Sequence, residues 1–194
     1  AEKQAVAHLM YEIGRAVNMQ YNAWSSASNT TNAYRALLEN FDYAPSLRYV
    51  VARYYTPREW QALMVAELKA ARPVFYTGYN SKGTAAHAFV LDGYDGKGYF
   101  HVNWGWGGMS DGYFLLHHLV PSAQGAGGGS VEGYSILNDA IIGFCPSVTY
   151  TGSAKAAEYV ADQVFVVDDH VGESSTQKLL PAKVISLANT TIMP

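Results

Sequence analysis

Apolar residues recur at helical spacing along the start of the chain. In residues 1–17, AEKQAVAHLMYEIGRAV, the pattern predicts a helix whose buried face contains Ala5, Leu9, Ile13 and Val17, widened by Val6 and Met10. No capping residue precedes this helix. We therefore expect the chain to have been cut out of a longer polypeptide.

Two further helices are predicted before the pattern changes. A Ser/Thr/Asn-rich loop at 22–32 precedes a short helix with Tyr34, Leu37, Leu38 and Phe41 toward the core, capped by Thr31 or Asn32. Thr56-Pro57-Arg58-Glu59 combines a capping-box pair with proline at the first helical position. The third helix is expected to begin there and to end near Arg72-Pro73.

From Pro73 onward the period is that of β-strands, with glycine between most of them. The predicted strands are PVFYTGY, AHAFVLDGY, GYFHVNW, GYFLL and DAIIGF. Helices followed by antiparallel strands define the α+β class. After Pro146 the composition changes, and QVFVV and AKVISL are weak strand candidates. We expect residues 1–146 to form one domain, and 147–194 to be a linker and the possible start of a β-rich C-terminal module.

Composition narrows the possible partners and cofactors. The 194 residues are 49% hydrophobic and 15% charged, with a formal charge of −3 and no Lys/Arg cluster, which disfavours nucleic acid as a partner. No apolar run approaches the roughly 20 residues of a membrane span.

Adjacent His117 and His118 would point opposite ways on a strand, which disfavours a shared metal. GYNSKGT has Thr84 where a phosphate loop needs lysine. We expect neither metal nor cofactor.

His87 and Asn103 lie at opposite ends of a predicted hairpin, AHAFVLDGYDGKGYFHVNWGWGG. Whether they share a face depends on the loop, because side chains alternate along a strand. A two-residue Asp95-Gly96 turn would put them on opposite faces, whereas an odd loop reverses this. We predict a three-residue loop that pairs 94 with 98 and leaves Asn103 diagonal to His87, about 7 to 8 Å away between backbone positions.

An asparagine beside a histidine can fix the histidine as a base. The amide oxygen accepts from one imidazole nitrogen, which leaves the other nitrogen to take a proton from a thiol or hydroxyl. We expect Trp104 to point to the face away from Asn103. Trp106 follows in a glycine-flanked turn, where its indole would shield the bond between Asn103 and His87 from water.

The segments AHAFVLDG, HVNWGWGG and SDGYFLL resemble the streptopain family of bacterial cysteine peptidases, relatives of papain. The resemblance extends to about Gly143 and implies a papain-like fold, polypeptide substrates and a Cys-His mechanism. Secretion as an inactive precursor, with a prodomain and an extracellular or cell-surface location, is also implied. The residues that it assigns are His87 as the base, Asn103 as its orienter, Trp104 and Trp106 as supports, and Gly125, Gly127, Gly128 and Gly129 as a mobile loop beside the substrate cleft.

The nucleophile implied by this resemblance does not match any residue of the chain. In the family, the cysteine and the oxyanion-hole glutamine lie on the N-terminal side of the matching region. Cys145, the only cysteine, comes after AIIGF and before a proline, so we expect a buried or strand-end thiol. The chain alone is therefore predicted to be inactive. The alternatives are an inactive relative that binds peptides or a partner, and one chain of a nicked enzyme whose cysteine is on another chain.

Overall fold

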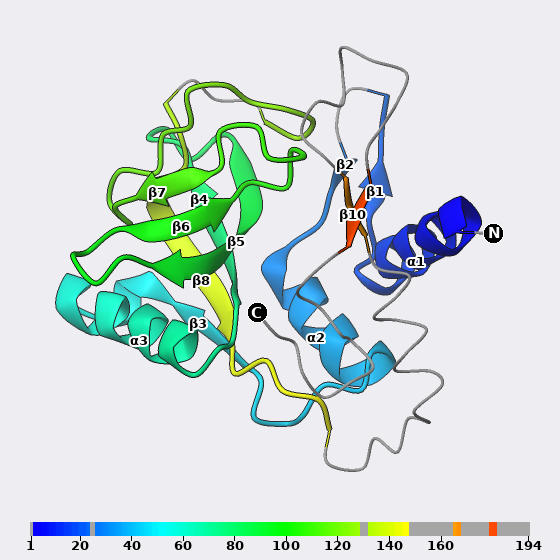
Figure 1. The fold of residues 1–194 in the computed structure, drawn as a ribbon, viewed down its shortest axis with the longest axis horizontal. Helices are drawn as coiled ribbons and strands as arrows, with labels where there is room; N and C mark the ends of the chain where they lie inside the picture. Colours follow the sequence, from blue (N-terminus) through cyan, green and yellow to red (C-terminus); the bar gives the residue numbers. More distant parts are fainter. Residues whose placement is uncertain (1, 24–25, 129–131, 148–164, 168–178, 182–194) are drawn as a thin grey trace. The chain divides into compact units, whose positions relative to one another are not determined.

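The computed structural model describes residues 2–23, 26–128, 132–147, 165–167 and 179–181 (Figure 1). The chain divides into two compact units, one of residues 49–143 and the other of residues 1–48 with 144–194. Helices and an antiparallel sheet are both present, and most strands of the sheet follow the last helix, so the predicted α+β class is confirmed.

The unit of residues 1–48 and 144–194 contains two helices that contact each other, α1 (Glu2–Ala16) and α2 (Thr30–Asn40). Leu9 and Ile13 are partly buried on α1, as their spacing predicts. Val6 and Met10 are exposed, so the prediction that they widen the buried face is wrong.

The cap of α2 differs slightly from the prediction. Its N-cap is Asn29, whose side-chain oxygen accepts a hydrogen bond from the backbone N–H of Asn32 at 2.8 Å. The N-cap thus lies two residues before Thr31, the nearer of the two predicted caps. The described residues of this unit also include two short antiparallel pairs. They are β1 (Gln20–Tyr21) with β2 (Ser26–Ala27), and β9 (Phe165–Val167) with β10 (Leu179–Pro181). β9 falls within the predicted QVFVV, whereas AKVISL lies outside the described residues.

The unit of residues 49–143 is built on a six-stranded sheet in the order β3-β8-β4-β5-β6-β7 (Figure 1). The strands are β3 (Arg48–Val51), β4 (Val74–Tyr79), β5 (Ala86–Tyr94), β6 (Phe100–Asn103), β7 (Gly112–Phe114) and β8 (Ile136–Ile142). All pairs from β8 to β7 are antiparallel. Every strand predicted between Pro73 and Phe144 is present, although β8 begins earlier than DAIIGF.

Helix α3 (Pro57–Lys69) follows a short 3-10 helix, η1 (Ala52–Tyr54), and packs against β4 and β5. The predicted capping box is confirmed. The Thr56 hydroxyl accepts from the Glu59 N–H at 3.3 Å, and the Glu59 carboxylate accepts from the Thr56 N–H at 2.8 Å. The helix ends at Lys69, a few residues before the expected end at Arg72-Pro73.

One face of the sheet carries the hydrophobic core. Alternate residues of β4, β5 and β6 point to this face, and α3 covers it with Trp60 and Met64. The indole N–H of Trp60 donates to the hydroxyl of Tyr76 at 2.9 Å, which satisfies both buried polar groups. The strand residues in this core are Val74, Tyr76, Phe89, Leu91, Phe100, Val102 and the following Trp104. His87, at the start of β5, extends this same row of side chains.

Candidate active site

The register of the β5–β6 hairpin decides which side chains share a face with His87. Tyr94 pairs with Phe100, and the Asp95 N–H donates to the Tyr99 carbonyl at 3.0 Å. The loop is odd in length, as predicted, with residues 96–98 inside this last hydrogen bond, but 94 pairs with 100 and not with the predicted 98. A bulge between Leu91 and Gly93 then shifts the register by one residue. Beyond the bulge, Val90 pairs with Asn103. Because Val90 and His87 are three residues apart, Asn103 points to the face opposite His87.

His87 is partly buried, and its Nε2–H donates to the backbone carbonyl oxygen of Trp104 at 2.8 Å. A carbonyl oxygen can only accept, so this contact places the hydrogen on Nε2. In the neutral ring, Nδ1 is then the nitrogen with an available lone pair. A Cβ atom built on Gly127 would lie 3.8 Å from Nδ1, so the backbone at Gly127 passes beside the nitrogen that can take a proton.

The predicted hydrogen bond between Asn103 and His87 is wrong, because the bulge turns Asn103 away. The Asn103 side-chain oxygen instead accepts from the backbone N–H of Gly105 at 2.9 Å. This N–H belongs to the same peptide group as the Trp104 carbonyl that receives the hydrogen from His87. Asn103 and His87 therefore hold the two ends of one peptide dipole, and each hydrogen bond polarises the group for the other.

Trp104 points away from Asn103, as predicted, and its side chain lies on the same face of the sheet as that of His87. The indole is fully buried, and its ring contacts Phe89 with 4.6 Å between centroids. Its N–H donates to the carbonyl of Ser110 at 3.0 Å, and its backbone N–H donates to the carboxylate of Asp111 at 2.9 Å. The carbonyl that orients His87 thus belongs to a residue held from both its main chain and its side chain.

Trp106 forms the closest aromatic contact of His87. The two rings stack with 4.6 Å between centroids and 21° between planes. The indole N–H of Trp106 donates to the carbonyl of Ala126 at 2.8 Å, which holds the indole in place. Trp106 is 9% exposed, so it covers one side of the imidazole against water.

The glycine-rich loop, residues 121–134, is described at 121–128 and 132–134, and its first part is attached to Trp106. A Cβ atom on Gly125 would lie 2.8 Å from two atoms of the Trp106 ring, so a side chain at this position would displace the indole. The Gly128 N–H donates to the Gly125 carbonyl at 2.9 Å. Gly127 has a φ of +79°, which favours glycine. Gly129 lies outside the described residues.

Burial decides the protonation of His87. It lowers the pKa of the imidazole, because the charged ring loses hydration, and the hydrogen bond to the Trp104 carbonyl partly opposes this effect. The neutral ring, which can accept a proton, is therefore favoured at neutral pH. A thiolate beside Nδ1 would raise the pKa of the ring again by stabilising the imidazolium.

The other histidines and Cys145 have different surroundings. The Nδ1 of His101 forms a 2.5 Å hydrogen bond with the carboxylate of Asp92 at the bulge, which indicates a structural role. His117 and His118 are exposed, and the described residues contain no group of three or more potential metal ligands. The Cys145 thiol is exposed just after β8, so the expected burial is wrong, whereas its place near a strand end agrees with the prediction.

Tyr134 and Gly78 belong to the site although the sequence did not point to them. The Tyr134 ring lies 5.3 Å from the His87 ring, and Gly78 is the register partner of His87 on β4. A Cβ atom on Gly78 would lie 1.9 Å from the Tyr134 carbonyl oxygen, so only glycine lets Tyr134 approach. The one signal for Gly78 is a glycine inside a predicted strand, which often marks a close backbone approach.

Comparison with known proteins identifies the class. The model of the Peptidase C10 family matches residues 1–114, which is more than half of the chain. An α+β fold with an oriented histidine and this match define a papain-like cysteine peptidase class. The chain belongs to the Peptidase C10 family.

Individual relatives agree with this assignment. Streptopain from Streptococcus pyogenes is 41% identical over 145 residues, which cover 75% of this chain and 36% of streptopain. The thiol protease/hemagglutinin PrtT from Porphyromonas gingivalis is 41% identical over 146 residues, 75% of this chain and 16% of that protein. The chain thus spans about a third of the length of the streptopain that it matches.

Solved structures show the same fold. Active wild-type interpain A, a cysteine protease from Prevotella intermedia, matches with a TM-score of 0.61 and 32% identity over 71% of this chain and 55% of interpain A. A prointerpain A fragment in which a cysteine is replaced by alanine matches with a TM-score of 0.55 and 31% identity, over 71% of this chain and 41% of the fragment. The predicted papain-like fold is therefore confirmed.

Proposed function

We propose that this chain supplies the histidine side of the active site of a cysteine endopeptidase that hydrolyses peptide bonds in polypeptides. The observation that carries the proposal is the hydrogen bond from Nε2 of His87 to the Trp104 carbonyl. It leaves Nδ1 as a base beside Gly127, in a site that aromatic rings shield from water. Family membership supports the reaction class.

His87 acts as base and then as acid in this proposal. Nδ1 takes the proton of a cysteine thiol, and the thiolate attacks the peptide carbonyl to form an acyl-enzyme. The imidazolium then returns the proton to the leaving amine, and water hydrolyses the thioester with His87 again as base. Thiolate formation matters because a free cysteine has a pKa of about 8.5 and is mostly protonated at neutral pH.

The roles of the neighbouring residues follow from their contacts. Trp104 orients His87 through its carbonyl, and Asn103 acts one step further away by fixing that peptide group. Trp106 shields the imidazole. The loop that contains Gly125, Gly127 and Gly128 borders the substrate cleft, and we extend this role to Gly129.

The nucleophilic cysteine lies outside residues 1–194 in this proposal. Cys145 follows β8, its carbonyl oxygen accepts from the Ala44 N–H at 2.8 Å, and it precedes Pro146. These are the features of a residue that closes a strand. Residues 1–146 would then form part of a peptidase domain, in keeping with the 145 residues matched by streptopain, and 147–194 would begin another module.

Biosynthesis as a secreted precursor belongs to the same proposal. One of the matching structures is a fragment of prointerpain A, a precursor form, which supports a prodomain for this protein. No helix in the described residues has the length and apolar character of a membrane span.

The 194-residue chain alone is expected to hydrolyse no peptide substrate, because it lacks the attacking thiolate. The measurement is hydrolysis of a fluorogenic casein by the purified chain, together with intact-mass analysis after incubation with a thiol-reactive peptide probe. A simple alkylating reagent serves as a positive control for the accessible Cys145 thiol. Hydrolysis that is abolished in Cys145→Ala would contradict the proposal, since it would make Cys145 the nucleophile.

A further inference from the structure

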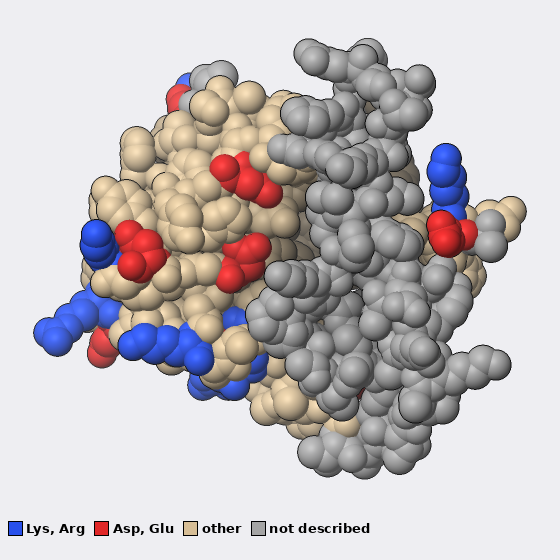
Figure 2. Space-filling view, viewed as in Figure 1, with Lys and Arg blue, Asp and Glu red and all other residues tan. Residues whose placement is uncertain are grey.

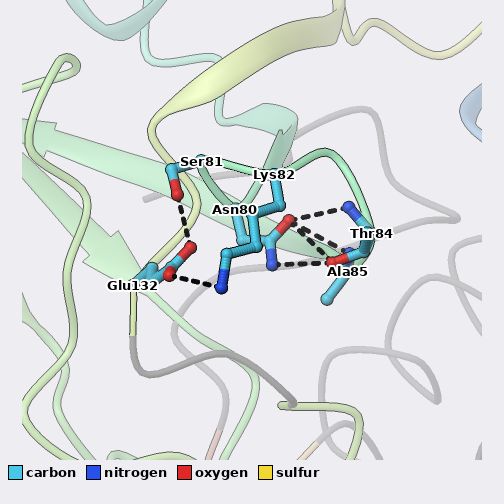
Figure 3. A network of polar contacts seen from close by, with 6 residues as sticks. All are labelled: Asn80, Ser81, Lys82, Thr84, Ala85 and Glu132. Carbon is cyan, nitrogen blue, oxygen red and sulfur yellow. Dashed lines mark hydrogen bonds and ion pairs between the residues drawn. The ribbon is translucent and has the colours of Figure 1, made fainter.

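The turn between β4 and β5, directly before His87, is held by the side chain of Asn80 (Figure 3). The Asn80 side-chain oxygen accepts from the backbone N–H groups of Thr84 at 2.8 Å and Ala85 at 3.2 Å. Its amide donates to the Thr84 hydroxyl at 3.1 Å. Asn80 is 6% exposed, so these hydrogen bonds are sheltered from water and fix the conformation of the turn.

Two residues of this turn bind the side-chain carboxylate of Glu132, which lies near the C-terminal end of the glycine-rich loop. The Ser81 hydroxyl donates a short hydrogen bond to one oxygen of Glu132, and Lys82 forms a 3.3 Å ion pair with the other oxygen (Figure 3). We call Ser81, Lys82 and Glu132 the loop anchor. The hydrogen bond from Ser81 and the charge of Lys82 lower the pKa of Glu132, so its carboxylate stays ionised at neutral pH.

Glu132 is connected to His87 through two tightly packed residues. Gly133 has a φ of +72°, and a Cβ atom there would lie 2.3 Å from the Leu119 carbonyl oxygen. The Tyr134 N–H donates to that same carbonyl at 2.8 Å. The Tyr134 ring contacts His87, and its hydroxyl donates to the Gln124 side chain at 3.0 Å, in the other limb of the loop. A displacement of Glu132 would therefore be transmitted to His87 through Gly133 and Tyr134.

We propose that Glu132 is a positioning residue, which through the loop anchor fixes the C-terminal end of the glycine-rich loop relative to His87. The part of the loop before residue 129 is attached through the Ala126 carbonyl, which accepts from the indole of Trp106. Two described parts of the loop, around Ala126 and at Glu132–Tyr134, are thus attached to the residues that surround His87. For its effect on peptide binding this inference rests on the proposed function, whereas the fixation of the loop is independent of it.

Hydrogen exchange of the tryptophan indoles tests the loop anchor in this chain. Glu132→Ala should accelerate exchange of the Trp106 indole N–H by about fivefold, as expected for losing a surface ion pair and its hydrogen bond. Exchange of the Trp104 indole N–H should stay within about twofold, because its partner is the Ser110 carbonyl, outside the loop. Lys82→Met should have a smaller effect of the same kind. In the double variant, the Trp106 indole N–H should exchange little faster than in Glu132→Ala alone, since both changes remove the same ion pair.

Lys97→Met, in the β5–β6 loop, is the matched control, because it also removes one exposed lysine but not a loop-anchor residue. The proposal is overturned if Trp106 exchanges no faster in Glu132→Ala than in Lys97→Met. It is also overturned if Trp104 and Trp106 accelerate equally, which would indicate general destabilisation. The exchange measurement needs no hydrolysis. It can therefore disprove the loop anchor without deciding the proposed peptidase function, and loss of that function would leave the loop anchor untouched. In an active peptidase, the same variants should raise KM severalfold with kcat within about twofold.

Discussion

Replacing His87 by glutamine in the complete peptidase is expected to lower kcat/KM for peptide hydrolysis by about a thousandfold, the usual range for losing a general base. Glutamine can still donate an N–H toward the Trp104 carbonyl but has no nitrogen that takes a proton from a thiol. The loss should appear mainly in kcat, since His87 acts in the chemical steps. Steady-state kinetics on a peptide substrate measure it.

Two further substitutions test whether the loss is specific to His87. His101→Gln is the matched control, because it changes a histidine on the neighbouring strand that pairs with Asp92. It should leave kcat/KM within about twofold. Asn103→Ala should lower kcat/KM by about tenfold, because Asn103 positions His87 only through the peptide group after Trp104. Equal losses in the His87 and His101 variants would contradict the role given to His87.

Gly78→Ala is expected to destabilise the chain by about 3 kcal/mol, as overpacking of a tight site does. The added Cβ would meet the backbone oxygen of Tyr134 at 1.9 Å and the Asn138 side chain at 2.9 Å. Neither atom has an easy escape, because Tyr134 is fully buried and Asn138 is 8% exposed. Urea unfolding followed by tryptophan fluorescence measures the free energy of unfolding.

Gly112→Ala provides the control for this measurement. Gly112 is also a strand glycine, but its nearest contact to an added Cβ is the Phe114 ring at 3.9 Å, and no positive φ is involved. Its free energy of unfolding should change by less than about 1 kcal/mol. If Gly78→Ala were no more destabilising than Gly112→Ala, the close approach of Tyr134 to β4 would be disproved.

The helices and strands of residues 49–143 follow well from the sequence, because their signals are local. The capping box at Thr56 and Glu59 involves residues three apart, and the alternating pattern typical of β-strands begins at Pro73. The bulge at Asp92 does not follow from any local pattern. It adds one residue to β5, and since faces alternate at every residue, this one residue reverses which face Asn103 occupies.

The chemistry of the site is predictable only in part for a related reason. His87 stands out in the sequence as a candidate base, but its orienter is a backbone carbonyl, a group that every residue carries. Which carbonyl is used depends on the register, so the sequence predicts a role for the indole of Trp104 and the amide of Asn103 but not for the Trp104 carbonyl. The contact between Tyr134 and His87 joins segments far apart in the chain and leaves no periodic trace.

Charged side chains of both signs lie on the surface. Figure 2 shows acidic and basic side chains both present on the visible face, with uncharged surface between many of them. The pKa of His87 is shifted by burial and by the hydrogen bond to the Trp104 carbonyl. The aromatic rings of Trp106 and Tyr134 supply that burial.

The tautomer of His87 tests the central claim most directly. Nitrogen NMR of the chain with labelled histidine distinguishes a ring protonated on Nε2 from one protonated on Nδ1. At neutral pH His87 should be neutral with its hydrogen on Nε2, and should become protonated only at a pH below the usual histidine range, because burial lowers its pKa. A hydrogen on Nδ1, or a charged ring at neutral pH, would contradict the account of His87 as a base whose free nitrogen is Nδ1.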